Sequence, residues 1–246
     1  MNCRFCNREQ PKFAKAHIIP RSFYKAVRGT GKYSVLIQAS KTEIKQDAKQ
    51  AGIYDHNILC EECEGRFNKF DDHGFRVFTG VFRKRELYRD HDGIPCAYLL
   101  PNARYDLLKL FVLSLYWRAS VSNLPFFSNV SLEHHEAHIR DMIEAQDPGE
   151  VDEYSFFCIH LPNAKYRNII LPPTPRKLDG MNCVQLHLPN LYIMLKVDTR
   201  PFSEPFSSFI IRREPPHYLA FQAYAGERED QFIRAFKSII RQHDGS

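Results

Sequence analysis

The chain has 246 residues, of which 43% are hydrophobic, so it can bury a sizeable core in one compact domain and still leave room for a smaller module. The net charge of +5 is unevenly distributed: residues 1–90 carry 18 Lys and Arg against 11 Asp and Glu, whereas the remainder carries 16 against 18. The positive excess therefore lies in the first 90 residues, which favours a polyanionic partner for that part of the chain.

The hydropathy pattern predicts a protein without membrane contact. No apolar run in the sequence approaches the roughly 18 residues of a membrane span, and Met1 is not followed by a signal-peptide pattern. We therefore expect a cytoplasmic location. In that reducing compartment the seven cysteines are not expected to form a disulfide framework.

Four of the cysteines come in two close pairs, Cys3 with Cys6 and Cys60 with Cys63. Each pair places two thiolates one tight turn apart, and four thiolates complete the tetrahedral shell of a structural zinc ion. The spacing therefore predicts a single Zn²⁺ that joins the N-terminus to the chain near residue 60. The other three cysteines stand alone and are predicted to be core thiols: Cys96, Cys158 and Cys183.

The first predicted unit, residues 1–90, consists of short elements around the cysteine pairs. Residues 1–10 are interpreted as a zinc knuckle, residues 17–23 as a short strand that turns at Pro20, and residues 26–50 as a polar loop. A helix is predicted to begin at Cys60, because apolar residues follow it at helical spacing. The basic run at residues 83–89 is a candidate phosphate contact, and residues 90–95 are expected to form a linker.

The second predicted unit, residues 91–246, is expected to contain helices first and strands later. A buried central helix is predicted behind the cap Asn102, and a second helix at residues 132–145 behind Ser131. Strands are predicted at residues 154–161, 166–171, 183–188, 192–197 and 208–212, with a final helix at residues 227–241. This order indicates an α+β fold with an antiparallel sheet.

The segment Ala16-His17-Ile18-Ile19-Pro20 lies between the two cysteine pairs, and with them it resembles the HNH nuclease family. The resemblance covers about residues 1–78. It implies a treble-clef, or ββα-metal, module in which His17 is the general base that takes a proton from the attacking water. It also implies that Asp55 orients this histidine, with Asn57 and His56 as alternatives.

The resemblance further implies a second metal, a catalytic Mg²⁺ or Mn²⁺, held by residues of the helix. Glu64 follows Cys63 directly, in the place of the family's helix ligand, and Asn68 lies one turn further along the same face. The family often carries an acidic ligand before the histidine, where this chain has Ala16. The site is then either degenerate or completed by another ligand: His56, Asp71 or Asp72.

Taken together, these features predict a metal-dependent endonuclease that hydrolyses DNA, with RNA as the less favoured substrate. The second unit would select the substrate, mediate assembly or regulate cutting. A role in bacterial restriction or antiphage defence is expected, with a homo-oligomer or a partner protein of the defence system as the possible assembly. The alternative is a treble-clef zinc module that has lost its chemistry and binds nucleic acid or a protein. His134 and His138, four residues apart, could also hold a metal, but surface positions are the simpler interpretation.

Overall fold

The computed structural model describes residues 1–28, 35–39, 44–47, 52–84, 86–89, 95–161, 169–203 and 206–221. Its α-helices are α1 (Arg21–Arg28), α2 (Glu61–Lys84), α3 (Tyr105–Val121) and α4 (His135–Ala145). Its strands are β1 (Ala16–His17), β2 (Val35–Ala39), β3 (Ile44–Asp47), β4 (Tyr54–Asp55), β5 (Leu87–Arg89), β6 (Pro95–Leu99), β7 (Phe156–His160), β8 (Ile169–Leu178), β9 (Met181–Leu188), β10 (Leu191–Lys196) and β11 (Tyr218–Phe221). The predicted mixture of helices and strands is confirmed.

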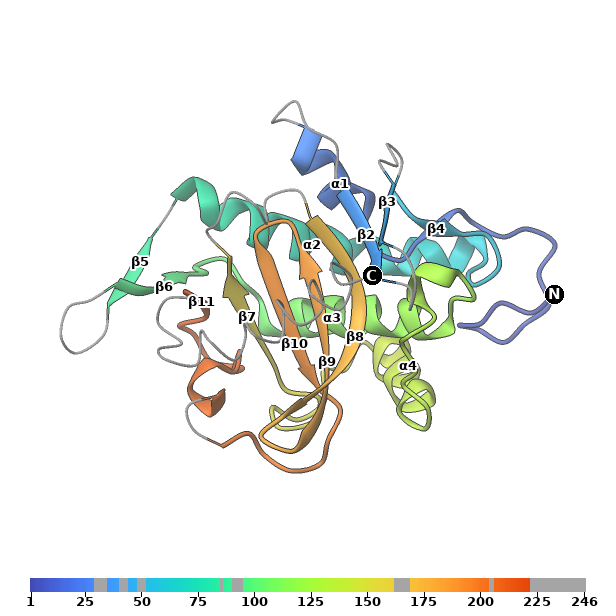
Figure 1. Ribbon diagram of the computed structural model, residues 1–246. Helices are drawn as coiled ribbons and strands as arrows, with labels where there is room; N and C mark the ends of the chain where they lie inside the picture. The colour runs from blue at the N-terminus through green and yellow to red at the C-terminus, as the bar shows by residue number, and fades with distance from the viewer. Residues whose placement is uncertain are drawn as a thin grey trace.

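One large sheet dominates the described part of the molecule, with the strand order β3-β2-β8-β9-β10-β7-β11-β6-β5 (Figure 1). Neighbouring strands are antiparallel except at two places, β7 with β11 and β2 with β8, which pair in parallel. The expectation of an antiparallel sheet is therefore right for most pairs and wrong for these two. The sheet also takes β2, β3 and β5 from the first 90 residues, where the sequence pattern predicts no strands of this sheet.

The centre of the sheet is built from the hairpins β8–β9 and β9–β10. Asp179 and Gly180 connect β8 to β9, and both have positive φ, of 49° and 76°. Two successive positive φ values match the right-handed twist of the flanking strands, and Asp-Gly is a favoured pair for such a turn. Local chemistry thus determines the register of this hairpin.

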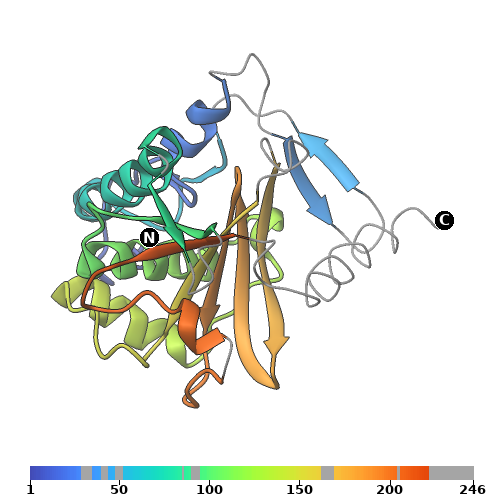
Figure 2. The same ribbon diagram turned by 90° about the vertical axis from the view of Figure 1, so that its left-hand side faces the viewer.

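A layer of helices covers one face of the sheet, as Figure 2 shows with the sheet seen nearly edge-on. Helix α3 is buried along almost its whole length, packs against α2 and α4, and donates a hydrogen bond from the Tyr116 hydroxyl to the carbonyl of Ile193 in β10, so it is the central helix that the sequence predicted. Phe5, Phe67 and Trp117 form an aromatic cluster with ring centroids 5.1–6.1 Å apart. One hydrophobic core therefore joins the N-terminal residues, α2, α3 and the inner face of the sheet.

Several predicted boundaries are wrong near the N-terminus. The strand expected at residues 17–23 ends at His17, and α1 begins directly after Pro20. The loop expected at residues 26–50 contains the last turn of α1 and the strands β2 and β3. Polar sequences can form edge strands when a neighbouring strand pairs with them: the polar strand β3 lies at the edge and pairs with β2, which pairs in turn with β8.

Other corrections concern helix starts and the last strands. The cap of α3 is Arg104 rather than Asn102, and α4 begins at His135, with His134 rather than Ser131 as its cap. In place of the strand expected at residues 208–212, residues 206–209 form a 3₁₀ helix and Ile210 makes a single β-bridge with Phe157; strand β11 follows later, at residues 218–221. The predicted helix at residues 227–241 and most of the predicted linker at residues 90–95 lie outside the described residues.

Among the described residues, no helix combines the length and the apolarity that a membrane span needs.

Candidate metal and catalytic site

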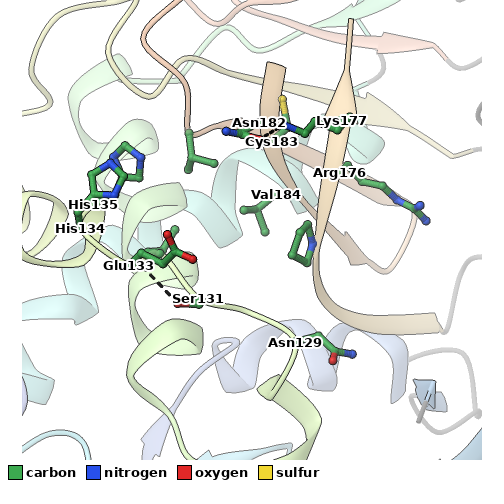
Figure 3. Close-up of a pocket in the computed structure, with 13 residues that line it drawn as sticks. Asn129, Ser131, Glu133, His134, His135, Arg176, Lys177, Asn182, Cys183 and Val184 are labelled. Carbon is green, nitrogen blue, oxygen red and sulfur yellow. Dashed lines mark hydrogen bonds between the residues drawn. The ribbon is translucent and has the colours of Figure 1, made fainter. Parts of the chain in front are cut away.

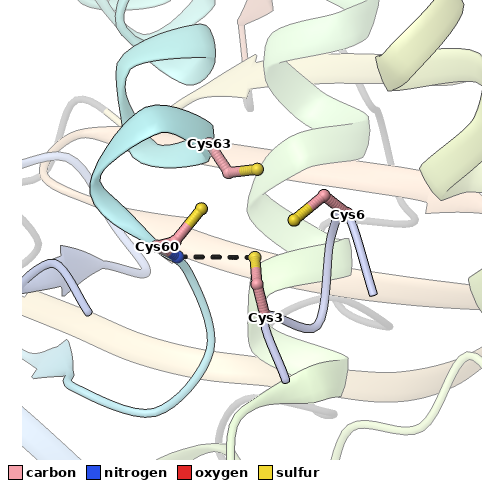
Figure 4. A group of neighbouring side chains, drawn as sticks. All are labelled: Cys3, Cys6, Cys60 and Cys63. Atoms are coloured by element: carbon pink, nitrogen blue, oxygen red, sulfur yellow. Dashed lines mark hydrogen bonds between the residues drawn. The ribbon is translucent and has the colours of Figure 1, made fainter. Parts of the chain in front are cut away.

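The four paired cysteines come together in space. Their Sγ atoms all lie within 4.8 Å of one another, with Cys3 and Cys6 on one side and Cys60 and Cys63 on the other (Figure 4). Four sulfur ligands at the usual Zn–S distance of about 2.3 Å lie about 3.8 Å apart around a tetrahedral ion. The cluster could therefore hold a metal such as zinc, as its spacing predicted.

Backbone contacts hold the two pairs face to face. The N–H of Arg4 donates to the carbonyl of Ile58 at 2.9 Å, and the N–H of Cys60 donates to Sγ of Cys3 at 3.4 Å. Asn7 has a φ of +54°, which turns the chain back after the first pair. The second pair lies at the start of α2, so a metal there would fix this helix to the N-terminal turn.

The thiols have the electrostatics of a cation site. Burial raises the pKa of Cys3 and the pKa of Cys63, and neighbouring thiols add to the rise at Cys63. Burial also tends to raise the pKa of Cys6, but hydrogen bonds from the backbone of Arg8 and from neighbouring thiols outweigh burial and lower this pKa to about 7. A divalent ion would replace the protons on all four sulfurs, because thiolates beside a metal stay deprotonated.

His17 lies on a two-stranded antiparallel ribbon next to α2. Strand β1 pairs with β4, with Ala16 opposite Asp55 and His17 opposite Tyr54. The His17 side chain is half-buried, and its ring centroid lies 5.7 Å from that of Tyr54. Along the chain α1, β2 and β3 lie between the two strands of the ribbon, and α2 follows β4.

Glu64 lies beside the backbone of His17. Its carboxylate accepts a hydrogen bond from the backbone N–H of His17, while its Oε2 atom is buried without a hydrogen-bond partner. Burial raises the pKa of Glu64, and the charge of the Arg118 guanidinium opposes this rise. A buried carboxylate oxygen that has no partner is the kind of atom that a cation or a donor from a ligand can satisfy.

Asp71, one of the three residues that could complete the predicted catalytic metal site, is already engaged in an ion pair. Its two oxygens accept hydrogen bonds from Arg118 at 2.7 and 2.9 Å, in a bidentate ion pair. The Arg118 side chain is 0% exposed and that of Asp71 14% exposed, so solvent screens this pair weakly. A carboxylate engaged in this way would have to break a buried ion pair in order to bind a metal.

Asp55 is buried on the other side of the ribbon from His17. Its Oδ2 accepts a hydrogen bond from the Ser122 hydroxyl at 2.8 Å, and its Oδ1 accepts one from the backbone N–H of Asn57 at 2.8 Å. Successive side chains of a strand point to opposite faces, so Asp55 shares a face with Ala16, and His17 shares the other with Tyr54. These contacts tie the ribbon to the end of α3 and give Asp55 a structural position.

The remaining candidates are exposed. Asn57 follows β4 with its side chain in solvent, and His56 is exposed with its ring against Tyr54. Asn68 and Asp72 are exposed on the same side of α2 as Glu64, one and two turns further along. The structure therefore brings His17 and Glu64 together and leaves Asn57, Asn68 and Asp72 at the surface nearby.

Arg118 is the residue of this region that the sequence analysis missed. It lies in a helix whose other side chains are almost all apolar, and a charged residue on such a helix is costly to bury unless it has partners. A charged residue within this predicted buried helix was therefore the signal in the sequence that Arg118 has buried partners. The same signal applies to Lys109, whose ammonium group donates to the carbonyl of Glu150 at 2.6 Å. The partners themselves come from α2 and β1 and are distant in sequence.

The histidines before and within α4 do not form a metal cluster. His135 interacts with the Tyr154 hydroxyl at 3.0 Å, whereas His138 interacts with Glu153 at 2.6 Å. Across the described ranges, the four cysteines are the one group of three or more candidate ligands close enough to share an ion. The interpretation of these histidines as surface residues is consistent with this arrangement.

A cavity of about 430 Å³ lies beside these histidines, between the residues before α4 and the β8–β9 hairpin. Figure 3 shows His134 and His135 on one side and Lys177 and Asn182, which are hydrogen-bonded to each other, on another. Val184 forms part of its apolar lining. The cavity is separate from the predicted site, because neither His17 nor Glu64 lines it.

Comparisons of this chain with protein-family models, with curated proteins and with solved structures found no match. The resemblance to HNH nucleases therefore depends on the residues and their arrangement.

Proposed function

We propose that this protein is a metal-dependent endonuclease of the HNH type that hydrolyses phosphodiester bonds of DNA. The observation that carries the proposal is the contact between the backbone N–H of His17 and the Glu64 carboxylate, which places the two residues side by side. A half-buried histidine on the ribbon lies next to a carboxylate with a buried, unpartnered oxygen at the start of α2. The cysteine cluster supports this arrangement because it connects the start of the helix to the N-terminal turn.

In the proposed reaction, a ring nitrogen of His17 takes the proton from a water molecule as that water attacks phosphorus. Glu64, with its unpartnered Oε2, would hold a divalent ion, and Asn68 is close enough along the helix to assist. Bound Mg²⁺ or Mn²⁺ supplies stabilisation of the negative charge that develops on the phosphate and the leaving oxygen. The positive excess of residues 1–90 favours DNA or RNA as the polyanion.

The biological part of the proposal depends on the resemblance alone. We place the enzyme in the cytoplasm, in bacterial restriction or antiphage defence, with the second unit selecting the substrate, mediating assembly with a second copy or a partner protein, or regulating cutting. Small nuclease modules join many different domains, so the fold of the second unit does not by itself assign this role.

A second candidate function is a zinc module that binds nucleic acid or a protein without cutting. The buried guanidinium of Arg118 favours it, because a positive charge already stands beside Glu64 and Asp71. With that charge in place, the two carboxylates do not require a divalent ion for neutralisation. The two functions differ in whether the purified chain cuts nucleic acid when Mg²⁺ or Mn²⁺ is added.

The test is cleavage by the purified full chain, loaded with zinc, of double-stranded DNA, single-stranded DNA and RNA with Mg²⁺, Mn²⁺ or EDTA. We expect DNA cleavage that needs the added ion, because a closed four-cysteine site has no open position for substrate. His17→Ala should lower the rate about 10²–10⁴-fold, as loss of a general base does. Glu64→Ala should raise the ion concentration that is required, and by more than Asn68→Ala.

The matched control is His134→Ala, which removes an exposed histidine far from His17 in the sequence. It should cut like the parent. Cleavage by His17→Ala at the parental rate would contradict the role of this histidine. If the zinc-loaded parent cuts none of the substrates with either ion, the binding module is the correct function.

A further inference from the structure

Arg118, in the last turn of α3, is the most completely bonded side chain of this region. Arginine has five N–H groups, and here each has an acceptor. Nε and Nη2 donate to the backbone carbonyl and the hydroxyl of Ser114, at 3.2 and 3.3 Å. The other three N–H groups reach the carbonyl of His17 at 2.8 Å and both carboxylate oxygens of Asp71.

These contacts join three separate elements at the candidate site. Arg118 belongs to α3, Asp71 belongs to α2, and His17 belongs to β1. The backbone of His17 is held at both ends, because its N–H donates to Glu64 while its carbonyl accepts from Arg118. Asp71 and Glu64 lie about two turns apart on one side of α2. The position of His17 relative to that side of α2 therefore depends on Arg118.

Burial makes these contacts specific. The Arg118 side chain is fully buried, and its guanidinium carbon lies 5.1 Å from the ring centroid of Phe67. A lysine in this place could pair with Asp71 but could not reach three acceptors in fixed directions, because its ammonium is a point charge. Without any cation, Asp71 and Glu64 would be two partly buried carboxylates in mutual repulsion.

We propose that Arg118 is a positioning residue for the hydrolytic site, and that it sets the geometry of His17 against Glu64 from outside the first 90 residues. Residues after position 90 then contribute to the geometry of the site itself, through Arg118. This inference rests on the proposed nuclease function for its kinetic consequence. The structural part of the proposal, that Arg118 holds β1 against α2, can be tested by a measurement that does not depend on cleavage.

The kinetic test is Arg118→Lys in the full chain with zinc bound. We expect kcat for DNA cleavage to fall about 10–100-fold, since a misplacement of about 1 Å at a reacting group can cost that much. KM should stay within about twofold, because the Arg118 side chain is fully buried and cannot contact a bound substrate directly. Asp71→Asn should lower kcat similarly, and the double variant should lose little more than either single variant.

The control is Arg66→Lys, on α2, where the arginine is 41% exposed and pairs with Glu62 and Glu144. It should keep the parental kcat. Equal zinc content and equal circular dichroism in all the variants exclude a folding defect. A parental kcat in Arg118→Lys, measured on an active parent, would overturn the proposal.

Hydrogen exchange at the amides of β1 and β4 gives a readout that does not depend on activity. In Arg118→Lys these amides should exchange at least about tenfold faster, while those of α4 stay unchanged, because the anchored carbonyl of His17 is released. Unchanged exchange at β1 would overturn the positioning role whether or not the parent cuts. An inactive parent with faster exchange would instead sink the nuclease function and leave the anchoring role supported.

Discussion

Close thiols repel one another as anions, so a buried set such as Cys3, Cys6, Cys60 and Cys63 is stable either protonated or around a cation. Burial raises the pKa of Cys3 and of Cys63, which makes the metal-free thiolate state costly. The contribution of zinc to folding should therefore be large in this region. Structural zinc supplies on the order of 10 kcal/mol in small modules.

We expect the purified protein to hold one zinc ion and Cys63→Ser to lose it. Removing one thiolate opens the four-ligand shell, so the N-terminal turn and the start of α2 should separate. Metal analysis gives the stoichiometry, and hydrogen exchange over residues 1–20 and 52–70 reports the local unfolding. Cys158→Ala is the control, because this thiol is buried in the sheet away from the cluster. A folded parent without zinc would contradict this expectation.

At the scale of elements, the contact between α2 and α3 decides where the candidate site lies. Gly74 of α2 faces Phe111 of α3 so closely that an added Cβ would lie 2.4 Å from the ring. The two helices can approach at this point because glycine has no side chain. Their closeness is also what lets Arg118 reach Asp71.

Gly74→Ala should therefore destabilise the protein by about 1–3 kcal/mol, since overpacking a buried contact outweighs the gain of about 1 kcal/mol in helix propensity. The matched control is Gly65→Ala on the same helix, where an added Cβ has nothing within 4 Å. That variant should be unchanged or slightly more stable. Urea unfolding followed by circular dichroism measures both, and equal stability of the two variants would contradict the close approach.

At the scale of the whole molecule, buried histidines link stability to pH. Burial lowers the pKa of His73, His135, His187 and His217, in the case of His187 to about 3. The unfolded chain binds protons at these residues near pH 6.5, whereas the folded chain binds them only at lower pH. The unfolded state thus takes up more protons in this window, and stability must fall as the pH is lowered.

We expect the free energy of unfolding to decrease from about pH 6.5 towards pH 3, with His187 contributing up to about 1.4 kcal/mol per pH unit. His187→Gln should flatten this slope relative to the parent. Because zinc is also released in acid, the informative quantity is the difference between variant and parent in urea titrations at several pH values. Equal slopes would show that His187 does not supply the dependence.

Much of the fold was accessible from local patterns. Cysteine pairs with two residues between them predicted the metal cluster, helical periodicity predicted α2 and α3, and β-rich runs with turn residues predicted β7, β9 and β10. These features depend on neighbours in the chain, so their physical causes are visible in a short window of sequence. Helix starts were less accessible, because the caps of α3 and α4 are set by packing and not by a capping side chain.

The sequence by itself determined that Cys3, Cys6, Cys60 and Cys63 would meet. Only the tertiary structure decided that β2 joins the main sheet, that Asp55 faces away from His17, and that Arg118 forms an ion pair with Asp71. The physical reason is separation along the chain. Arg118 lies 101 residues from His17, and such a contact depends on how whole helices pack rather than on any local pattern.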